Sequence, residues 1–284
     1  MHRQLTGPLA ALLVGALVLL VSSPASATPA PDHPASMSAL GDSITRGFNA
    51  AGWHRDWPSR SWSTGTDDAV DSHYSRLSAL DEAILGRAHN NAVSGAKVGA
   101  LAGQAMTSVS QRAEYVTILI GANDACRETE AQMTSVTAFR SRFRAAMDVL
   151  DSQSPEPRVL VASIPDLKRL WQVGRNSSAA RAAWSSYDIC QSILADPLST
   201  DRSDVDRRNR VQQRVKDYNV QLAEVCASYR FCRYDGGAVF GYPFSLGQLS
   251  GWDYFHPNTS GQAVIADLTW EAGYWSASEP AAAG

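Results

Sequence analysis

The stretch Leu40-Gly41-Asp42-Ser43-Ile44-Thr45 decides how this chain is organised. The segment before it, from Ser36 to Leu40, mixes apolar and small residues and predicts a short strand that ends in a tight turn at Gly41. We expect Ser43 at or near the start of a helix, where free backbone N–H groups favour developing negative charge. A serine there suits a nucleophile whose attack produces an oxyanion. An ordinary helix N-cap is the alternative, because Ser, Asp and Asn are all favoured at that position.

The first 27 residues have the features of a secretory signal. His2 and Arg3 form a short basic start, an apolar run follows from Leu9 to Val21, and Ala25-Ser26-Ala27 is a small-residue cleavage site. The run is shorter than the stretch of about 20 residues that crosses a bilayer, although a single-pass anchor is the alternative. We therefore predict a signal peptide over residues 1–27, and a protein that is secreted with no stable membrane insertion.

The remainder of the chain predicts one domain. We expect a disordered, proline-rich lead-in over residues 28–35, a single domain over 36–275 and a flexible, Ala-rich tail over 276–284. The formal net charge of −3 disfavours a nucleic-acid or anionic-membrane partner. We expect a monomer.

Four cysteines, Cys126, Cys190, Cys226 and Cys232, suggest two disulfides in an exported chain, with three possible connectivities. Cys226 and Cys232 lie close together across an expected helix-to-strand turn, so we pair them, and Cys126 with Cys190. Neither a Cys-x-x-Cys pair nor a His-x-x-x-His spacing occurs. We therefore expect no metal site and no cofactor.

Short apolar runs alternate with longer amphipathic segments. The runs that predict strands are 115–120, 158–163, 230–234 and, more weakly, 88–93. Apolar residues at steps of three and four predict helices over 136–150, 206–229 and 260–270. This alternation predicts an α/β fold, a parallel sheet covered by helices on both sides, with its site at the carboxyl ends of the strands.

Each predicted strand end carries a residue suited to serine hydrolysis. Ser43 follows the first strand, Gly95 lies in the loop after the second, and Asn123 follows the third. Near the C-terminus, His256 can act as a base because imidazole titrates near neutral pH, and Asp253 can orient it. The N–H groups of Ser43 and Gly95, with the Asn123 amide, can form an oxyanion hole of three donors.

These residues carry a resemblance to a known family. Gly41-Asp42-Ser43, Gly95, Gly121-Ala122-Asn123-Asp124 and Asp253-Tyr254-Phe255-His256 resemble the four sequence blocks of the SGNH (GDSL) hydrolase family, of the secreted bacterial esterase and lipase type. The resemblance implies a flavodoxin-like, three-layer α/β/α sandwich. It also implies cleavage of carboxylic esters through an acyl-enzyme on Ser43, with lipid or small acyl esters as substrates. The catalytic residues would be Ser43, Asp253 and His256, and the oxyanion hole would be formed by Ser43, Gly95 and Asn123.

Two insertions follow strand ends and can form walls of the site. The first, 52–65, holds three of the eight tryptophans, Trp53, Trp57 and Trp62. We predict that these bind substrate, an acyl chain or a sugar face. Alternatively, they attach a long loop to the body of the domain. The second insertion, 166–204, is expected to be helical around 179–194.

Two other functions fit the same residues. One is O-deacetylation of an extracellular polysaccharide, which uses the same chemistry. The other, from a different class, is a secreted carbohydrate-binding protein on a hydrolase scaffold. The intact set of Ser43, Asn123, Asp253 and His256 argues against the binding protein, since a binder has no need of them.

Overall fold

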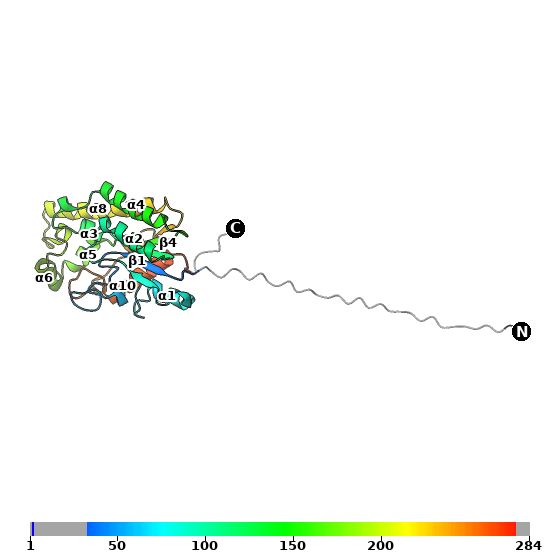
Figure 1. The fold of residues 1–284 in the computed structure, drawn as a ribbon. Helices are drawn as coiled ribbons and strands as arrows, with labels where there is room; N and C mark the ends of the chain where they lie inside the picture. The colour runs from blue at the N-terminus through cyan, green and yellow to red at the C-terminus, as the bar shows by residue number, and fades with distance from the viewer. Residues whose placement is uncertain (1, 3–32, 277–284) are drawn as a thin grey trace. The chain divides into compact units, whose positions relative to one another are not determined.

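The computed structural model describes residues 33–276 and His2, while residues 1, 3–32 and 277–284 lie outside the described residues (Figure 1). The predicted signal peptide apart from His2, most of the predicted lead-in and nearly all of the predicted tail lie there. Residues 33–35, at the end of the lead-in, are described. The N–H of Ala35 donates to the Glu114 carboxylate at 2.7 Å.

The centre of the domain is one parallel sheet of five strands in the order β2-β1-β3-β4-β5. The strands are β1 Met37–Gly41, β2 Ala88–Asn90, β3 Tyr115–Leu119, β4 Arg158–Val161 and β5 Cys232–Tyr234. Every residue of β1 and β3 is buried, as expected of central parallel strands covered on both faces. The strand order is that of flavodoxin-like folds, so the predicted fold class is confirmed.

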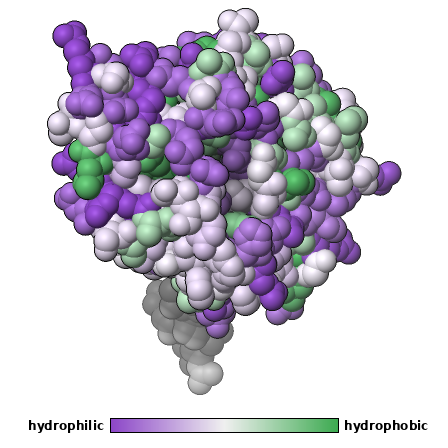
Figure 2. All heavy atoms as spheres, turned by 90° about the vertical axis from the view of Figure 1, so that its left-hand side faces the viewer, coloured by the Kyte–Doolittle hydropathy of each residue, from purple (hydrophilic) through white to green (hydrophobic). Residues whose placement is uncertain are grey.

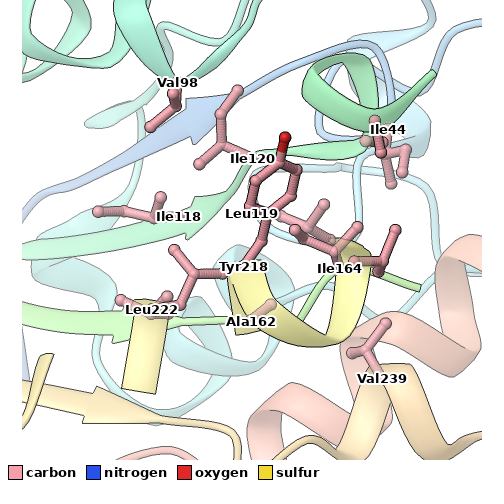
Figure 3. Close-up of a cluster of buried hydrophobic side chains, with 14 of the residues drawn as sticks. Ile44, Val98, Ile118, Leu119, Ile120, Ala162, Ile164, Tyr218, Leu222 and Val239 are labelled. Carbon is pink, nitrogen blue, oxygen red and sulfur yellow. The ribbon is translucent and has the colours of Figure 1, made fainter. Parts of the chain in front are cut away.

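Helices cover both faces of the sheet (Figure 1). On one face, α2 (Leu101–Ser110) packs against α4 (Val136–Asp151), which packs against α8 (Arg202–Cys226). Figure 3 shows Tyr218 and Leu222 extending from α8 toward the strands. On the other face, α1 (His73–Leu80) and α10 (Thr259–Glu271) cover a smaller cluster that includes Met37, Tyr115 and Leu160.

The shorter helices lie in the connections. They are α3 Ala122–Ala125, α5 Leu167–Gly174, α6 Ser178–Ser186, α7 Gln191–Leu194 and α9 Ala238–Gly241, with single 3₁₀ turns at Pro58–Arg60, Glu82–Ile84, Val98–Ala100, Glu130–Gln132 and Leu246–Gln248. The insertion over 166–204 therefore holds three helices, more than its sequence predicts. No helix within residues 33–276 is both long and apolar enough to cross a membrane.

The helix expected after Ser43 does not form, and that prediction is wrong. Residues 42–50 make consecutive turns instead, in which the Phe48 N–H donates to the Ser43 carbonyl at 2.9 Å. Gly47 and Asn49 have left-handed backbone, with φ of 62° and 57°, which a right-handed helix does not accommodate. The Arg46 carbonyl is also used by the N–H of Trp57. A helix N-terminus therefore does not contribute to anion stabilisation at Ser43.

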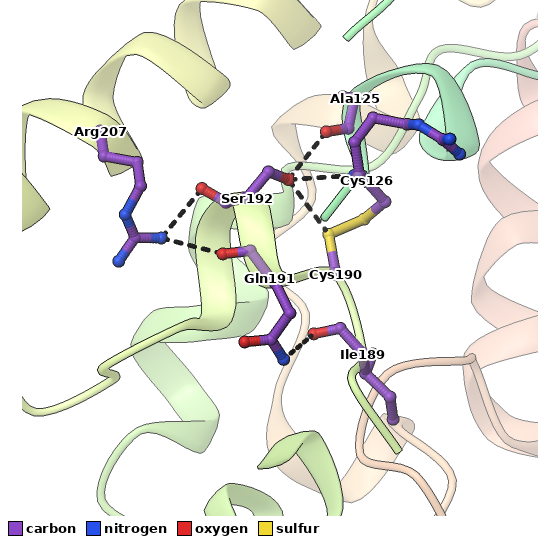
Figure 4. Close-up of a disulfide and its surroundings, with 8 residues drawn as sticks. Ala125, Cys126, Ile189, Cys190, Gln191, Ser192 and Arg207 are labelled. Carbon is purple, nitrogen blue, oxygen red and sulfur yellow. Dashed lines mark hydrogen bonds between the residues drawn. A yellow bond between two sulfur atoms is a disulfide. The ribbon is translucent and has the colours of Figure 1, made fainter. Parts of the chain in front are cut away.

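The structure contains both disulfides that the sequence predicts. Cys226–Cys232 joins the end of α8 to the start of β5. Cys126–Cys190 joins the end of α3 to the start of α7 (Figure 4). Beside it, the Ser192 hydroxyl donates to the Ala125 carbonyl at 2.8 Å, so the second insertion is held against the carboxyl edge of the sheet.

Candidate active site

Three neighbouring strands place the predicted residues at one edge of the sheet. Ser43 follows β1, Gly95 lies in the loop after β2, and Asn123 lies in α3 after β3. The chain leaves β1 toward β2 on one side and returns to β3 on the other, and ligands bind at such switch points of open parallel sheets. These three residues and His256 line one hollow of about 240 Å³.

A chain of hydrogen bonds connects Ser43, His256 and Asp253. The Ser43 Oγ lies 2.9 Å from His256 Nε2, and His256 Nδ1 lies 2.7 Å from Asp253 Oδ2. An ionised carboxylate can only accept, so Nδ1 carries the ring proton of the neutral imidazole and donates it to Asp253. Nε2 is then the acceptor for the Ser43 hydroxyl. This is the proton arrangement that a serine nucleophile requires.

The Asp253 carboxylate is almost completely buried and accepts four hydrogen bonds. Oδ1 accepts the backbone N–H groups of Phe255 and His256 at 2.9 and 3.0 Å. Oδ2 accepts His256 Nδ1 and the Asn49 amide at 2.6 Å. Burial alone would raise the pKa of Asp253, but the bonds from His256 and Asn49 and the charge of His256 outweigh it, so its pKa is lowered. Asp253 is therefore ionised at neutral pH.

Asn49 is a residue of this site that the sequence reasoning missed. It is buried, and its φ of 57° is one that Asn adopts more readily than most residues. The Ser250 hydroxyl donates to the Asn49 carbonyl at 2.9 Å, which attaches the Asn49 turn to the loop of Asp253. The two partners lie 204 residues apart, so no local pattern could have indicated the contact.

The three expected oxyanion donors face the same hollow. Within the described residues, the N–H groups of Ser43 and Gly95 have no hydrogen-bond partner. The Asn123 amide donates one hydrogen to the Ala96 carbonyl at 3.0 Å and retains its second. Gly95 has a φ of 82°, but a Cβ there would meet no atom within 4 Å. Its glycine is therefore required by backbone conformation and not by space.

The turn after β3 also holds the Gly95 loop in place. Besides the Asn123 contact to Ala96, the Asp124 carboxylate accepts the Val98 N–H at 2.9 Å and the Thr134 hydroxyl at 2.6 Å. Burial raises the pKa of Asp124. The two ends of the Asn-Asp pair thus position the oxyanion donor on the neighbouring loop.

The turn that carries Ser43 is held in place by the side-chain amide of Gln104. A Cβ on Gly41 would lie 2.2 Å from the Leu119 carbonyl oxygen, so only glycine fits between β1 and β3. The Gln104 amide accepts the Gly41 N–H at 2.8 Å and donates to its carbonyl at 2.9 Å. Asp42 Oδ1 accepts the Ile44 N–H at 3.0 Å, and burial raises the pKa of Asp42 to about 7.

A protein-family model confirms the family that the sequence blocks resemble. The model of the GDSL-like Lipase/Acylhydrolase family matches residues 39–264. The chain belongs to this family. No curated protein sequence matches this chain.

Several solved structures resemble this chain. An α/β hydrolase from the metagenome of Lake Arreo, Spain, is 21% identical, with a TM-score of 0.51, over 84% of this chain and 94% of its own. The extracellular lipase of Streptomyces rimosus is 22% identical, with a TM-score of 0.47, over 84% and 99%. A family 3 carbohydrate esterase of Clostridium thermocellum is 13% identical, with a TM-score of 0.48, over 84% and 94%. At these identities the likeness concerns the fold alone.

Two phenylalanines lie beside the His256 ring. The ring centroids of Phe48 and Phe255 lie 4.9 and 5.0 Å from that of His256. Phe255 also lines a second, apolar hollow of about 40 Å³, whose other walls include Ile44, Ala122 and Leu170. A small apolar space therefore adjoins the hollow that holds Ser43.

The predicted tryptophan wall is wrong for Trp62. Its side chain is completely buried, its Nε1 donates to Thr45 Oγ1 at 3.3 Å, and its ring packs edge-on against His73. Trp57 is partly buried, with its ring against Gly52 and under the Arg55 guanidinium. The Trp62 ring therefore attaches the loop to the domain, because burial of a large ring stabilises more than exposure. The ring contacts of Trp57 lie within its own loop. Trp53 alone of the three is substantially exposed, at 39%.

Within residues 33–276, no group of three or more His, Cys, Asp or Glu side chains is arranged to hold a metal ion.

Proposed function

We propose that this GDSL hydrolase cleaves carboxylic esters through an acyl-enzyme on Ser43. The observation that supports this most directly is the unbroken chain from the Ser43 hydroxyl through His256 to the ionised Asp253. A binding protein would gain nothing from a buried carboxylate that orients an imidazole toward a serine in a hollow.

The proposed reaction follows from the positions of these groups. Ser43 Oγ attacks the ester carbonyl carbon while its proton passes to His256 Nε2, and Asp253 stabilises the resulting imidazolium. The carbonyl oxygen becomes an oxyanion that accepts hydrogen bonds from Ser43 N–H, Gly95 N–H and the Asn123 amide. The alcohol leaves with the proton from His256, forming the acyl-enzyme. Water then gives a proton to His256 and attacks the acyl carbon, which releases the carboxylic acid and restores Ser43.

The acyl group would be short. The apolar hollow beside Phe255, at about 40 Å³, offers room for only a few water-sized spheres, each of about 10–15 Å³. We therefore propose acetyl to butyryl esters as the preferred substrates. The protein would act outside the cell, which its two disulfides favour, since disulfides persist in oxidising compartments.

A fluorophosphonate probe tests the mechanism. The wild-type protein should be labelled on Ser43, as located by peptide mass spectrometry, and Ser43→Ala should not be labelled. Ser94 is a matched control because it lines the same hollow without contacting His256, and Ser94→Ala should still be labelled. Absence of labelling in the folded wild-type protein would refute the hydrolase and favour the binding protein.

A series of p-nitrophenyl esters tests the acyl preference. Turnover should be highest for two to four carbons and decline for longer chains. A rate that rises steadily from four to twelve carbons would contradict the short-acyl proposal while leaving the mechanism intact.

A further inference from the structure

Three exposed aromatic side chains from distant segments contact one another near the site. The ring of Trp53 lies 5.0 Å from that of Tyr187 and 5.9 Å from that of Trp252, between centroids. The three are 39%, 54% and 53% exposed. Within the described residues, they are the only aromatic residues among the most exposed large apolar side chains, the others being aliphatic. We call these three residues the aromatic cluster.

The aromatic cluster is connected to the catalytic residues. Trp53 contacts His54, His54 contacts Phe48, and Phe48 contacts His256, so rings in contact lead from the cluster to the imidazole. Trp252 directly precedes Asp253 in the chain, and Ile189, two residues after Tyr187, lines the hollow of Ser43. A ligand on the cluster therefore lies within reach of a substrate at Ser43.

A polar groove meets both the cluster and the site. It has a volume of about 770 Å³ and shares the Cys126–Cys190 disulfide with the hollow of Ser43. Its polar lining is Arg127, Glu128, Thr129, Gln132, Asp188 and Gln191. Asp188 directly follows Tyr187, so the groove and the cluster meet at this segment.

This combination favours a carbohydrate over a hydrocarbon. A lipid chain in the groove would remove water from its charged and amide groups without replacing their hydrogen bonds, which is costly. A sugar presents a flat C–H face, which packs on indole and phenol rings, together with hydroxyls that bond the groove. Figure 2 shows that hydrophobic residues on the side carrying α6 are scattered among hydrophilic ones and form no broad apolar surface for a membrane.

We propose that the aromatic cluster and the adjacent polar groove bind the carbohydrate part of an acylated glycan, whose ester lies at Ser43. The sugar ring stacks on Trp53, Tyr187 and Trp252, and hydroxyls bond groove residues such as Arg127 and Asp188. The assignment of substrate rests on the proposed esterase function, but the binding of glycan does not depend on turnover.

Binding is tested first in the Ser43→Ala protein, which removes catalysis. Affinity gel electrophoresis uses two O-acetylated polysaccharides, acetylated xylan and acetylated glucomannan, as probes, with phosphatidylcholine vesicles in a parallel flotation assay. At least one glycan should retard the protein, and adding Tyr187→Ala should abolish the retardation. Tyr187→Phe keeps the ring and should retain most of it. Leu85→Ala, equally exposed at 54% but before β2 at the opposite edge of the sheet, should change nothing.

Kinetics with active protein test whether binding assists catalysis. For the glycan that binds, Trp252→Ala and Tyr187→Ala should each lower kcat/KM for deacetylation about 10-fold more than for p-nitrophenyl acetate, mainly through KM. Melting temperatures separate this effect from unfolding.

Three results would overturn the proposal. They are no retardation by either of the two acetylated polysaccharides, ring-dependent binding to vesicles in place of glycans, and equal losses on glycan and p-nitrophenyl esters in the ring variants. None of these would contradict the esterase itself, which depends on labelling of Ser43.

Discussion

His256 and His73 make similar hydrogen bonds in two different regions, and only one of them is placed for catalysis. His256 lies between Asp253 and the Ser43 hydroxyl at the carboxyl edge of the sheet. His73 lies between the Tyr115 hydroxyl at Nδ1 and the Thr269 hydroxyl at Nε2, both at 2.8 Å, beneath the sheet. Each ring nitrogen has a partner in both cases.

The two rings carry their proton on opposite nitrogens. The Thr269 hydroxyl donates to the Ile265 carbonyl at 2.6 Å, so it must accept from His73 Nε2–H, and Nδ1 accepts from Tyr115. His73 is completely buried, and burial lowers its pKa to about 3. His256 instead faces a carboxylate on Nδ1 and a hollow on Nε2. The two rings therefore differ in the two features that activation of a hydroxyl by an imidazole requires, an anionic partner and access for substrate.

The largest difference in kcat between the two regions should come from removing the hydroxyl that contacts Nε2 of each histidine. We expect Ser43→Ala to lower kcat by up to about 10⁶-fold with little change in stability, and His256→Ala to lose about as much, because the two act as a unit. Thr269→Ala should instead lower the melting temperature and leave kcat per folded molecule unchanged. Ester turnover and calorimetry measure both effects. Near wild-type turnover by Ser43→Ala would refute the assignment.

The next largest difference in kcat should come from changing the residue that contacts Nδ1 of each histidine. Asp253→Asn should lower kcat by up to about 10⁴-fold, less than His256→Ala, because the ring loses its orientation and its counter-charge. Tyr115→Phe should cost roughly 1–3 kcal/mol of stability, since it leaves a buried nitrogen without its donor, and should leave activity intact. A comparable kcat loss in Tyr115→Phe would show that the two regions are coupled.

Asn123 has no counterpart around His73, and it tests the oxyanion hole alone. Asn123→Ala should lower kcat with little change in KM, by up to about 2.7–4 kcal/mol in activation free energy, since two backbone donors remain. Steady-state kinetics on a short ester measure the changes in kcat and KM separately. If only KM rises, Asn123 binds substrate and does not stabilise the oxyanion.

The pH dependence of stability should reveal His73. Its folded pKa of about 3 lies below the ordinary 6.5, so the unfolded chain binds a proton between these values and the folded chain does not. The stabilisation is therefore complete above pH 6.5 and is lost by about 1.4 kcal/mol per unit as pH falls toward 3. Asp42 has the opposite effect on stability. Because its folded pKa is raised, its contribution to the free energy of unfolding is lost as pH rises from 3.8 to about 7.

His73→Gln isolates the histidine contribution, since Asp42 is present in both proteins. The advantage of wild type over His73→Gln in free energy of unfolding, from urea denaturation at pH 7.5 and 5, should shrink at the lower pH. A difference that is constant with pH would contradict a neutral, buried His73.

The smallest effect should come from Asn49, which acts through Asp253. Asn49→Gly keeps the left-handed backbone and loses the amide, so kcat should fall about 10-fold with KM unchanged. Steady-state kinetics on a short ester measure both parameters. An unchanged kcat would show that the two backbone N–H groups suffice to hold Asp253.

The fold class, the order of the strands along the chain and the residues of the GDSL blocks can all be read from the sequence. Strands buried on both faces must be continuously apolar, as in β3, and helices between them must carry an apolar stripe, as in α4. The chemistry of ester hydrolysis needs a hydroxyl, an imidazole and donors, which the residues after the strands supply. The proximity of Cys226 to Cys232 is likewise local. These features can be recognised in the sequence because each depends on residues that are neighbours along the chain.

The tertiary structure alone decided which similar residues differ in role. Trp53 and Trp62 lie in one loop, yet Trp62 fills the core and Trp53 joins Tyr187 and Trp252 at the surface. Asn49 becomes part of the site only because the fold places it against Asp253. The turns after Ser43 replace a helix where Gly47 and Asn49 adopt left-handed backbone and Trp57, from the following loop, donates to the carbonyl of Arg46. All of these depend on contacts between segments far apart in the chain, whose energies local sequence patterns do not encode.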